Sequence, residues 1–275
     1  MPRPEGLKLP RALRPEWPAP QAVHALFTTR AGGGSRSPFD TLNLGDHVGD
    51  DPQSVTANRA ALAIALDARP VFLQQVHGTK VIRLDASTPD NTVADACLST
   101  ERRLACTVMV ADCLPVLFTD TQGSQVAAAH AGWRGLAGSA GLGVLESTVD
   151  AVLAQVRQHH PRRSREATAA DILVWLGPCI GPTAFEVGFE VRTAFLATDP
   201  AATACFAALP TGKWLADLAA LARLRLRALG IQRIYGNDSS ARWCTVGQAS
   251  DFFSHRRDAV QLGSTGRMAA CIWLV

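Results

Sequence analysis

Three residues of metal-binding types stand in loops that follow short apolar segments: His77, Cys113 and His130. Each has small residues nearby that let a ligand approach. Zinc takes imidazole and thiolate ligands, and a catalytic zinc site keeps three protein ligands and one open position. The long spacing matches no short metal motif, but functional groups gather at strand ends in α/β sheets. The three residues are therefore a candidate metal site.

Other roles for the same residues stay open on residue types alone. A cysteine and a histidine also form nucleophilic pairs, and either residue can be purely structural. Cys179 competes as a reactive thiol, because a turn before a helix stabilises a thiolate; a small buried cysteine is the simpler interpretation. The remaining cysteines have apolar or uninformative surroundings and are interpreted as structural: Cys97, Cys106, Cys205, Cys244 and Cys271.

An arginine interrupts an otherwise apolar helix face. A helix is expected over 52–66, capped by Asp51. Arg59 recurs with Val55 and Leu62 on one side of this helix. Either its side chain snorkels to solvent, or its guanidinium points inward to meet an anion.

Two further stretches combine residues that contact ligands in many proteins. Segment 252–258 and Arg267 mix aromatic rings with cations, which indicates either a solvated face or a purine or phosphate contact. The loop 30–35 contains three consecutive glycines, but it lacks the Lys-Ser/Thr ending of a phosphate-binding P-loop.

The elements that must position these residues alternate irregularly along the chain. Strands are expected over 24–29, 71–76, 81–84, 106–110, 116–118, 126–129, 172–176, 231–235 and 270–274, and further helices over 136–157, 185–196 and 214–229. Without strict strand–helix alternation, this order predicts an α/β domain with a mixed sheet rather than a Rossmann fold. Residues 1–20 form a Pro-rich arm, and no composition break divides 21–275, which is expected to be a single domain.

Composition excludes several classes of protein. With 47% hydrophobic and 19% charged residues the 275-residue chain is globular, and a formal charge of +3 is too small to indicate nucleic-acid binding. No apolar run reaches the length of a membrane span, and the first 20 residues contain no apolar core of a secretory signal. Seven scattered cysteines are expected to stay reduced, so a cytoplasmic location is predicted. The sequence carries no signal for an oligomeric state.

Several motifs follow one another along nearly the whole chain. They are Asn43-Leu44-Gly45, His47-Val48-Gly49-Asp50, Asn58-Arg59, Gln74-Gln75-Val76-His77-Gly78, Ala111-Asp112-Cys113-Leu114-Pro115-Val116, His130-Ala131-Gly132-Trp133-Arg134-Gly135, Gly177-Pro178, Ile180-Gly181-Pro182, Phe185-Glu186-Val187-Gly188, Phe253-Ser254, Arg256-Arg257-Asp258 and Thr265-Gly266-Arg267. Together these motifs resemble the YfiH-type family, long described as multicopper polyphenol oxidoreductases or laccase-domain proteins.

The resemblance implies a layered α/β/α single domain with a mixed central sheet. It implies one Zn²⁺ bound by His77, Cys113 and His130, which would then be the catalytic residues. Similar proteins act on purine nucleosides with phosphate: they phosphorolyse adenosine, inosine, guanosine and S-methyl-5'-thioadenosine, and they deaminate adenosine by hydrolysis.

Two alternative functions come with the same family. The older description implies Cu²⁺ and polyphenol oxidation, for which seven histidines in the whole chain are few. Similar bacterial proteins are also linked to the editing of peptidoglycan precursors.

Within the nucleoside hypothesis, four further residues are expected to contact substrate. Arg59 is the first choice for phosphate, with Asn43 beside it, and Arg134 is a second choice. His47 is expected to line the pocket. Asp112, next to a candidate ligand, or His47 is expected to orient one of the metal ligands.

Overall fold

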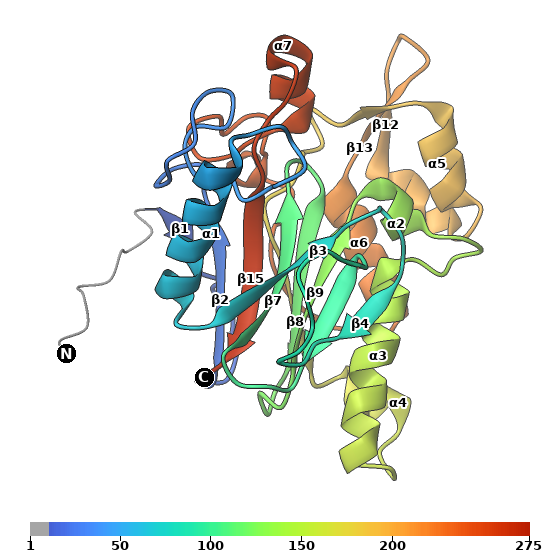
Figure 1. Ribbon diagram of the computed structural model, residues 1–275. Helices are drawn as coiled ribbons and strands as arrows, with labels where there is room; N and C mark the ends of the chain where they lie inside the picture. Colours follow the sequence, from blue (N-terminus) through green and yellow to red (C-terminus); the bar gives the residue numbers. More distant parts are fainter. Residues whose placement is uncertain (1–10) are drawn as a thin grey trace, which may run out of the picture.

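The computed structural model describes residues 11–275, and its core contains two six-stranded sheets (Figure 1). The expected Pro-rich arm lies outside the described residues over 1–10. The first sheet has the order β1 (Ala12–Leu13), β2 (Val23–Thr28), β15 (Met268–Leu274), β7 (Leu104–Val110), β3 (Arg69–Gln74) and β5 (Thr92–Val93). Strands β2, β15 and β7 pair antiparallel, and β7, β3 and β5 pair parallel.

The second sheet is also mixed. Its order is β14 (Arg233–Gly236), β10 (Ile172–Leu176), β8 (Leu114–Asp120), β9 (Val126–Ala131), β6 (Ala96–Ser99) and β4 (Val81–Arg83). A small third sheet is formed by β11 (Glu186–Val187), β13 (Trp214–Ala216) and β12 (Phe206–Ala208).

Seven α-helices connect and cover these sheets in the described part of the chain. They are α1 (Pro52–Leu66), α2 (Trp133–Ala137), α3 (Val144–His159), α4 (Arg165–Ala169), α5 (Phe189–Leu196), α6 (Leu218–Ala228) and α7 (Val260–Leu262). Two 3₁₀ turns, η1 (Pro200–Cys205) and η2 (Ala241–Trp243), and one π-helical turn, η3 (His255–Ala259), complete the chain. No helix within residues 11–275 is both long and apolar enough to cross a membrane.

The two large sheets pack face to face. Alternate residues of each strand point to opposite faces of its sheet, so every second residue can join the core between the sheets. In β7, Cys106 and Val108 join a core shared with Ala128 of β9, whereas Ala105 and Met109 pack in a cluster with residues of α1. Helices α3 and α6 cover the outer face of the second sheet. The order of layers is therefore helix, sheet, sheet, helix (Figure 1). The predicted α/β single domain with mixed pairing and no Rossmann arrangement is confirmed, and two packed sheets form its central part.

One predicted helix is divided by glycines. The segment 136–157 was expected to be continuous, but α2 ends at Ala137 and α3 begins at Val144. Gly138 and Gly141 between them adopt φ values of 64° and 79°, which glycine tolerates and a right-handed helix excludes. The expectation of a helix starting at 136 is therefore wrong, and the break places α2 directly after β9.

Two other predicted helices begin later than expected. Strands β11 and β13 occupy the first parts of 185–196 and 214–229, and α5 and α6 follow them. Asp217 explains the second boundary, because its carboxylate accepts from the backbone N–H of Ala220 and caps α6. Pairing with partner strands outweighed local helix propensity in both segments.

Candidate metal centre

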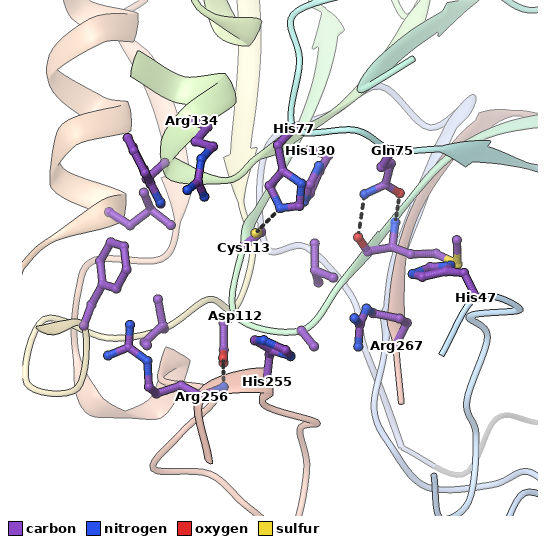
Figure 2. A pocket seen from close by; sticks show the side chains of 17 residues that line it. His47, Gln75, His77, Asp112, Cys113, His130, Arg134, His255, Arg256 and Arg267 are labelled. Atoms are coloured by element: carbon purple, nitrogen blue, oxygen red, sulfur yellow. Dashed lines mark hydrogen bonds between the residues drawn. The ribbon is translucent and has the colours of Figure 1, made fainter. Parts of the chain in front are cut away.

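The structure brings His77, Cys113 and His130 together. Their ligand atoms all lie within 4.8 Å of one another, and Cys113 Sγ is 3.6 Å from His77 Nε2 (Figure 2). The two imidazole rings stand edge to face, with centroids 4.8 Å apart. The residues come from the loop after β3, the turn between β7 and β8, and β9. Three chain segments far apart in sequence therefore converge on one point.

Strand geometry explains this convergence. Side chains of β9 alternate between its faces, so His130 lies on the same face as Ala128, which packs between the two sheets. Pro115 of β8 is the register partner of His130, which places the turn that carries Cys113 beside the histidine. His77 itself has a φ of 59°, a left-handed conformation that turns its loop toward the other two ligands.

A buried carboxylate holds both histidines. Asp95 lies directly before β6, in register opposite His130, and its carboxylate accepts from His130 Nδ1 at 2.9 Å. The same carboxylate accepts from the backbone N–H groups of His77 at 2.9 Å and Gly78 at 2.7 Å. A carboxylate only accepts, so His130 donates from Nδ1 and directs Nε2 at the cluster. Asp95 was missed in the sequence, where the only signal is an acid between two alanines before an apolar strand.

The charges of Cys113 and His130 stabilise each other. Burial raises the pKa of the Cys113 thiol, but the His130 charge and hydrogen bonds from both histidines outweigh it and lower the pKa to about 6. Burial lowers the pKa of His130, but the Cys113 thiolate and the Asp95 carboxylate outweigh it and raise the pKa to about 9. Near pH 7 the metal-free cluster is therefore a thiolate–imidazolium pair.

The cluster fits a tetrahedral metal ion. Bonds of about 2.0–2.3 Å from a tetrahedral zinc place its ligands roughly 3.3–3.6 Å apart. The Cys113 Sγ–His77 Nε2 distance of 3.6 Å agrees, and the limit of 4.8 Å for the whole set is wider than a bound ion would give. Gly132 leaves the space that this requires: a Cβ there would lie 2.7 Å from His77 Cδ2 and 2.9 Å from Cys113 Sγ. A thiolate with two imidazoles suits zinc and, by the same ligand chemistry, copper.

The cluster opens into a pocket of about 430 Å³, within the range of small-molecule sites. Arg134 and Arg256 lie on one side of the cluster, and His47, Gln75 and Arg267 lie on the other (Figure 2). The other lining residues are Met109, Val110, Ala111, Asp112, Trp133, Ile180, Phe185, Leu218 and His255. Cationic and apolar groups dominate this lining.

Of the four residues expected to contact substrate, His47 and Arg134 line the pocket, but Arg59 does not. The Arg59 guanidinium donates to the carbonyl of Leu44 at 2.9 Å, pairs with Asp46 at 3.2 Å and stacks 4.1 Å from the Phe72 ring. It borders a separate open hollow. Its inward position is explained by these contacts, which corrects the expectation that it awaits an anion.

Asn43 also lies outside the pocket lining. Its side chain is fully buried, and Oδ1 accepts from the backbone N–H groups of Gly45 and Arg267. Its Nδ2 donates to Asp50 and to the carbonyl of Gly45. With both ends engaged, Asn43 holds the backbone of Arg267 in place, which corrects its expected contact with substrate.

Two other candidate residues, Asp112 and Cys179, have structural roles. The Asp112 carboxylate is bonded to groups other than the candidate ligands: it accepts from Thr245 Oγ1 and from the backbone N–H of Arg256, both at 2.6 Å. It thereby ties the turn that carries Cys113 to the C-terminal wall of the pocket. Cys179 is buried, and burial raises the pKa of its thiol well above the ordinary value. A protonated buried thiol does not compete as a nucleophile.

Known proteins are similar to this chain in sequence and in fold. A family model described as "Multi-copper polyphenol oxidoreductase laccase" matches residues 24–275. A purine nucleoside phosphorylase of Pseudomonas aeruginosa is 47% identical over 263 residues, covering 95% of this chain and 98% of the relative. The purine nucleoside phosphorylase YfiH of Escherichia coli is 47% identical over 264 residues, with the same coverage.

Solved structures agree with these matches. The crystal structure of a Neisseria meningitidis protein has a TM-score of 0.83 at 42% identity and covers 96% of this chain and 98% of that one. The YfiH structure of Bacillus licheniformis has a TM-score of 0.79 at 32% identity, with coverage of 92% and 93%. Since the matches span almost the whole chain in both sequence and fold, the chain belongs to the YfiH-type family, whose sequence model bears the laccase description.

Proposed function

We propose that the chain is a zinc-dependent purine nucleoside phosphorylase. The observation that carries this proposal is the His77–Cys113–His130 cluster at the floor of a pocket lined by arginines. The relatives named purine nucleoside phosphorylase support the reaction class. The substrates that we propose are adenosine, inosine, guanosine and S-methyl-5'-thioadenosine, with inorganic phosphate as the second substrate.

The reaction requires an anion and a nucleoside in one cavity. A phosphate oxygen forms a bond to the ribose C1′ while the C1′–N9 bond breaks, and its electron pair leaves with the purine, which takes up a proton. The products are the free base and ribose 1-phosphate, or methylthioribose 1-phosphate. The lining supplies cations for phosphate and apolar surface, including Trp133 and Phe185, for the purine.

Hydrolytic deamination of adenosine is proposed as a second activity of the same pocket. A water oxygen forms a bond to purine C6 while the C6–N6 bond breaks, and the amino group takes up a proton from the water and leaves as ammonia. When bound by the three side chains, zinc would supply a Lewis acid and lower the pKa of a water molecule. Asp95 holds the histidines in position, through His130 Nδ1 and the backbone N–H of His77.

The ligand set distinguishes this proposal from a multicopper oxidase. Such an oxidase needs several copper centres. Within residues 11–275, the His77–Cys113–His130 cluster is the one group of three metal-binding side chains whose ligand atoms converge. One site of this kind suits a single ion.

The test is a set of parallel reactions with the purified zinc-loaded protein. Inosine is incubated with and without inorganic phosphate, adenosine without phosphate, and a catechol under oxygen-uptake recording. We expect hypoxanthine and ribose 1-phosphate in equal amounts only with phosphate, inosine from adenosine, and no oxygen uptake. Hypoxanthine release that ignores phosphate would refute phosphorolysis, and oxygen uptake with bound copper would restore the oxidase.

A further inference from the structure

The pocket is lined by three arginines, Arg134, Arg256 and Arg267, and none of them forms an ion pair with a carboxylate among residues 11–275. Arg267 is the one that is half-buried rather than exposed. Arg267 Nη1 donates to the carbonyls of Thr265 at 3.0 Å and Gly266 at 3.2 Å. Its Nε and Nη2 have no hydrogen-bond partner among residues 11–275, and no carboxylate in that part of the chain forms an ion pair with it. The guanidinium nevertheless lines the pocket beside His47 (Figure 2).

The guanidinium of Arg267 is partly withdrawn from water. Removing a cation from water is unfavourable unless an anion or several acceptors compensate it. Burial lowers the pKa of Arg267, and the negative charges that act against this effect are those of Cys113 and Asp112. Both residues line the same pocket, so the free edge of the guanidinium shares a cavity with the candidate metal ligands.

The backbone around Arg267 is built to hold it there. Its N–H donates to the fully buried Asn43 Oδ1 at 2.9 Å. Gly45 packs against its stem, where a Cβ would lie 2.7 Å from Arg267 Cγ. A side chain at position 45 would collide with the aliphatic stem of Arg267. Segment 43–45 therefore contacts both the backbone and the stem of Arg267 and sets the direction of its guanidinium.

We propose that Arg267, with His47 beside it, forms the inorganic phosphate subsite of the pocket. The inference rests on the proposed function, and it replaces Arg59 by a residue that faces the cavity. The two free donor groups of a guanidinium match the oxygens of a phosphate in a bidentate arrangement. The nucleoside then occupies the remaining part of the pocket, toward Trp133 and Phe185.

The experiment measures phosphate binding directly, without turnover. Zinc-loaded wild type and Arg267→Met are titrated with inorganic phosphate in a calorimeter. Arg267→Lys is a second variant, because it keeps a charge and a stem but loses the bidentate fork. We expect phosphate affinity to fall at least tenfold in Arg267→Met and several-fold in Arg267→Lys, with zinc content unchanged.

Arg223→Met is the matched control. Arg223 is also a half-buried arginine that donates to backbone carbonyls, those of Ile234, Gly236 and Asn237, but it lies outside the pocket lining. Its phosphate affinity should stay within twofold of wild type. Equal affinity in wild type and both Arg267 variants would overturn the proposal, because phosphate would then be held elsewhere, for example on the metal.

Further outcomes separate this inference from the proposed function. Phosphate binding that depends on Arg267, without release of base from any nucleoside, would keep the subsite and refute the phosphorylase. Phosphorolysis whose phosphate Michaelis constant is unchanged in Arg267→Met would keep the phosphorylase and refute the subsite. Arg267-dependent binding of inosine 5′-monophosphate but not of inorganic phosphate would also overturn the proposal, because the subsite would then hold a phosphate carried by the nucleoside.

Discussion

Replacing Asp95 with asparagine should weaken zinc binding although Asp95 touches no metal. The carboxylate is fully buried and accepts from His130 Nδ1 and from the backbone N–H groups of Val76, His77 and Gly78. An amide has one oxygen and one NH₂ group, so it cannot accept at both ends. One end must then present N–H donors either to the 76–78 loop or to the imidazole.

The size of the effect follows from this mismatch. If the amide oxygen stays with Val76 and Gly78, the NH₂ group faces His130, whose proton then moves to Nε2, the atom needed by the metal. If the amide flips, its oxygen serves His130 and the His77 N–H, but the N–H groups of Val76 and Gly78, on either side of His77, lose their acceptor. Either change removes a carboxylate that orients a ligand, which typically costs 10- to 100-fold in metal affinity, or about 1.4–2.7 kcal/mol.

The assay is competition for zinc against a fluorescent chelator, with circular dichroism and thermal unfolding to show that the variant is folded. Asp120→Asn is the matched control, because Asp120 is also buried and accepts from two backbone N–H groups, those of Gln122 and Ser124, outside the pocket. Zinc affinity within twofold of wild type in folded Asp95→Asn would refute the role assigned to Asp95.

Three further predictions concern the ligands and the pocket wall. Gly132→Ala should lower zinc affinity at least about tenfold, since its φ of −68° suits alanine but the new Cβ would lie 2.9 Å from Cys113 Sγ; unchanged affinity would show that the ligands can move aside. Zinc binding at pH 7.5 should release about one proton, from His130. The pKa values of about 6 for Cys113 and about 9 for His130 leave a thiolate and an imidazolium in the metal-free site. Calorimetry in buffers of different ionisation enthalpy measures the proton release, and a release near two protons would contradict the thiolate. Asp258→Asn should cost roughly 2 kcal/mol of unfolding free energy at pH 7, because burial raises the pKa of Asp258 but hydrogen bonds from Arg257 outweigh it and lower the pKa. The contribution is present above the ordinary aspartate pKa and is lost as pH falls through the lower folded value, so urea unfolding of the two proteins should converge in acid.

Residue type and loop context were enough to select the three candidate ligands. His77 and Cys113 stand after segments that form β3 and β7, as expected, whereas His130 lies within β9, one residue before its end, and not in a loop after it. Strand ends in a layered fold meet at one edge, so the three residues still converge. What the sequence could not supply was their partner Asp95, because its role depends on the register of β6 against β9. Register between distant strands is a tertiary property, which no local pattern encodes.

Side-chain direction limited the prediction of substrate contacts. Periodicity correctly placed Arg59 on the same helix side as Val55 and Leu62, but its guanidinium is occupied by Asp46 and the Phe72 ring. These partners come from other segments, so the helix pattern alone could not reveal them.

In the sequence, Arg256 and Arg267 could be described only as cations near aromatic residues, in segment 252–258 and at position 267. Of the two interpretations of Arg267, a solvated face does not agree with its position in the pocket. A long-range backbone contact with Asn43 sets this position, from a residue more than two hundred positions earlier in the chain.

The measurement that tests the central claim most directly is reconstitution of the metal-free protein with zinc, with hypoxanthine release from inosine and phosphate as the readout. The rate should rise in proportion to bound zinc and stop rising at about one ion per chain. His77→Ala, Cys113→Ala and His130→Ala should bind less zinc and lose the rate together. Full activity of the metal-free protein, or a rate restored by copper alone with oxygen consumption, would contradict the account.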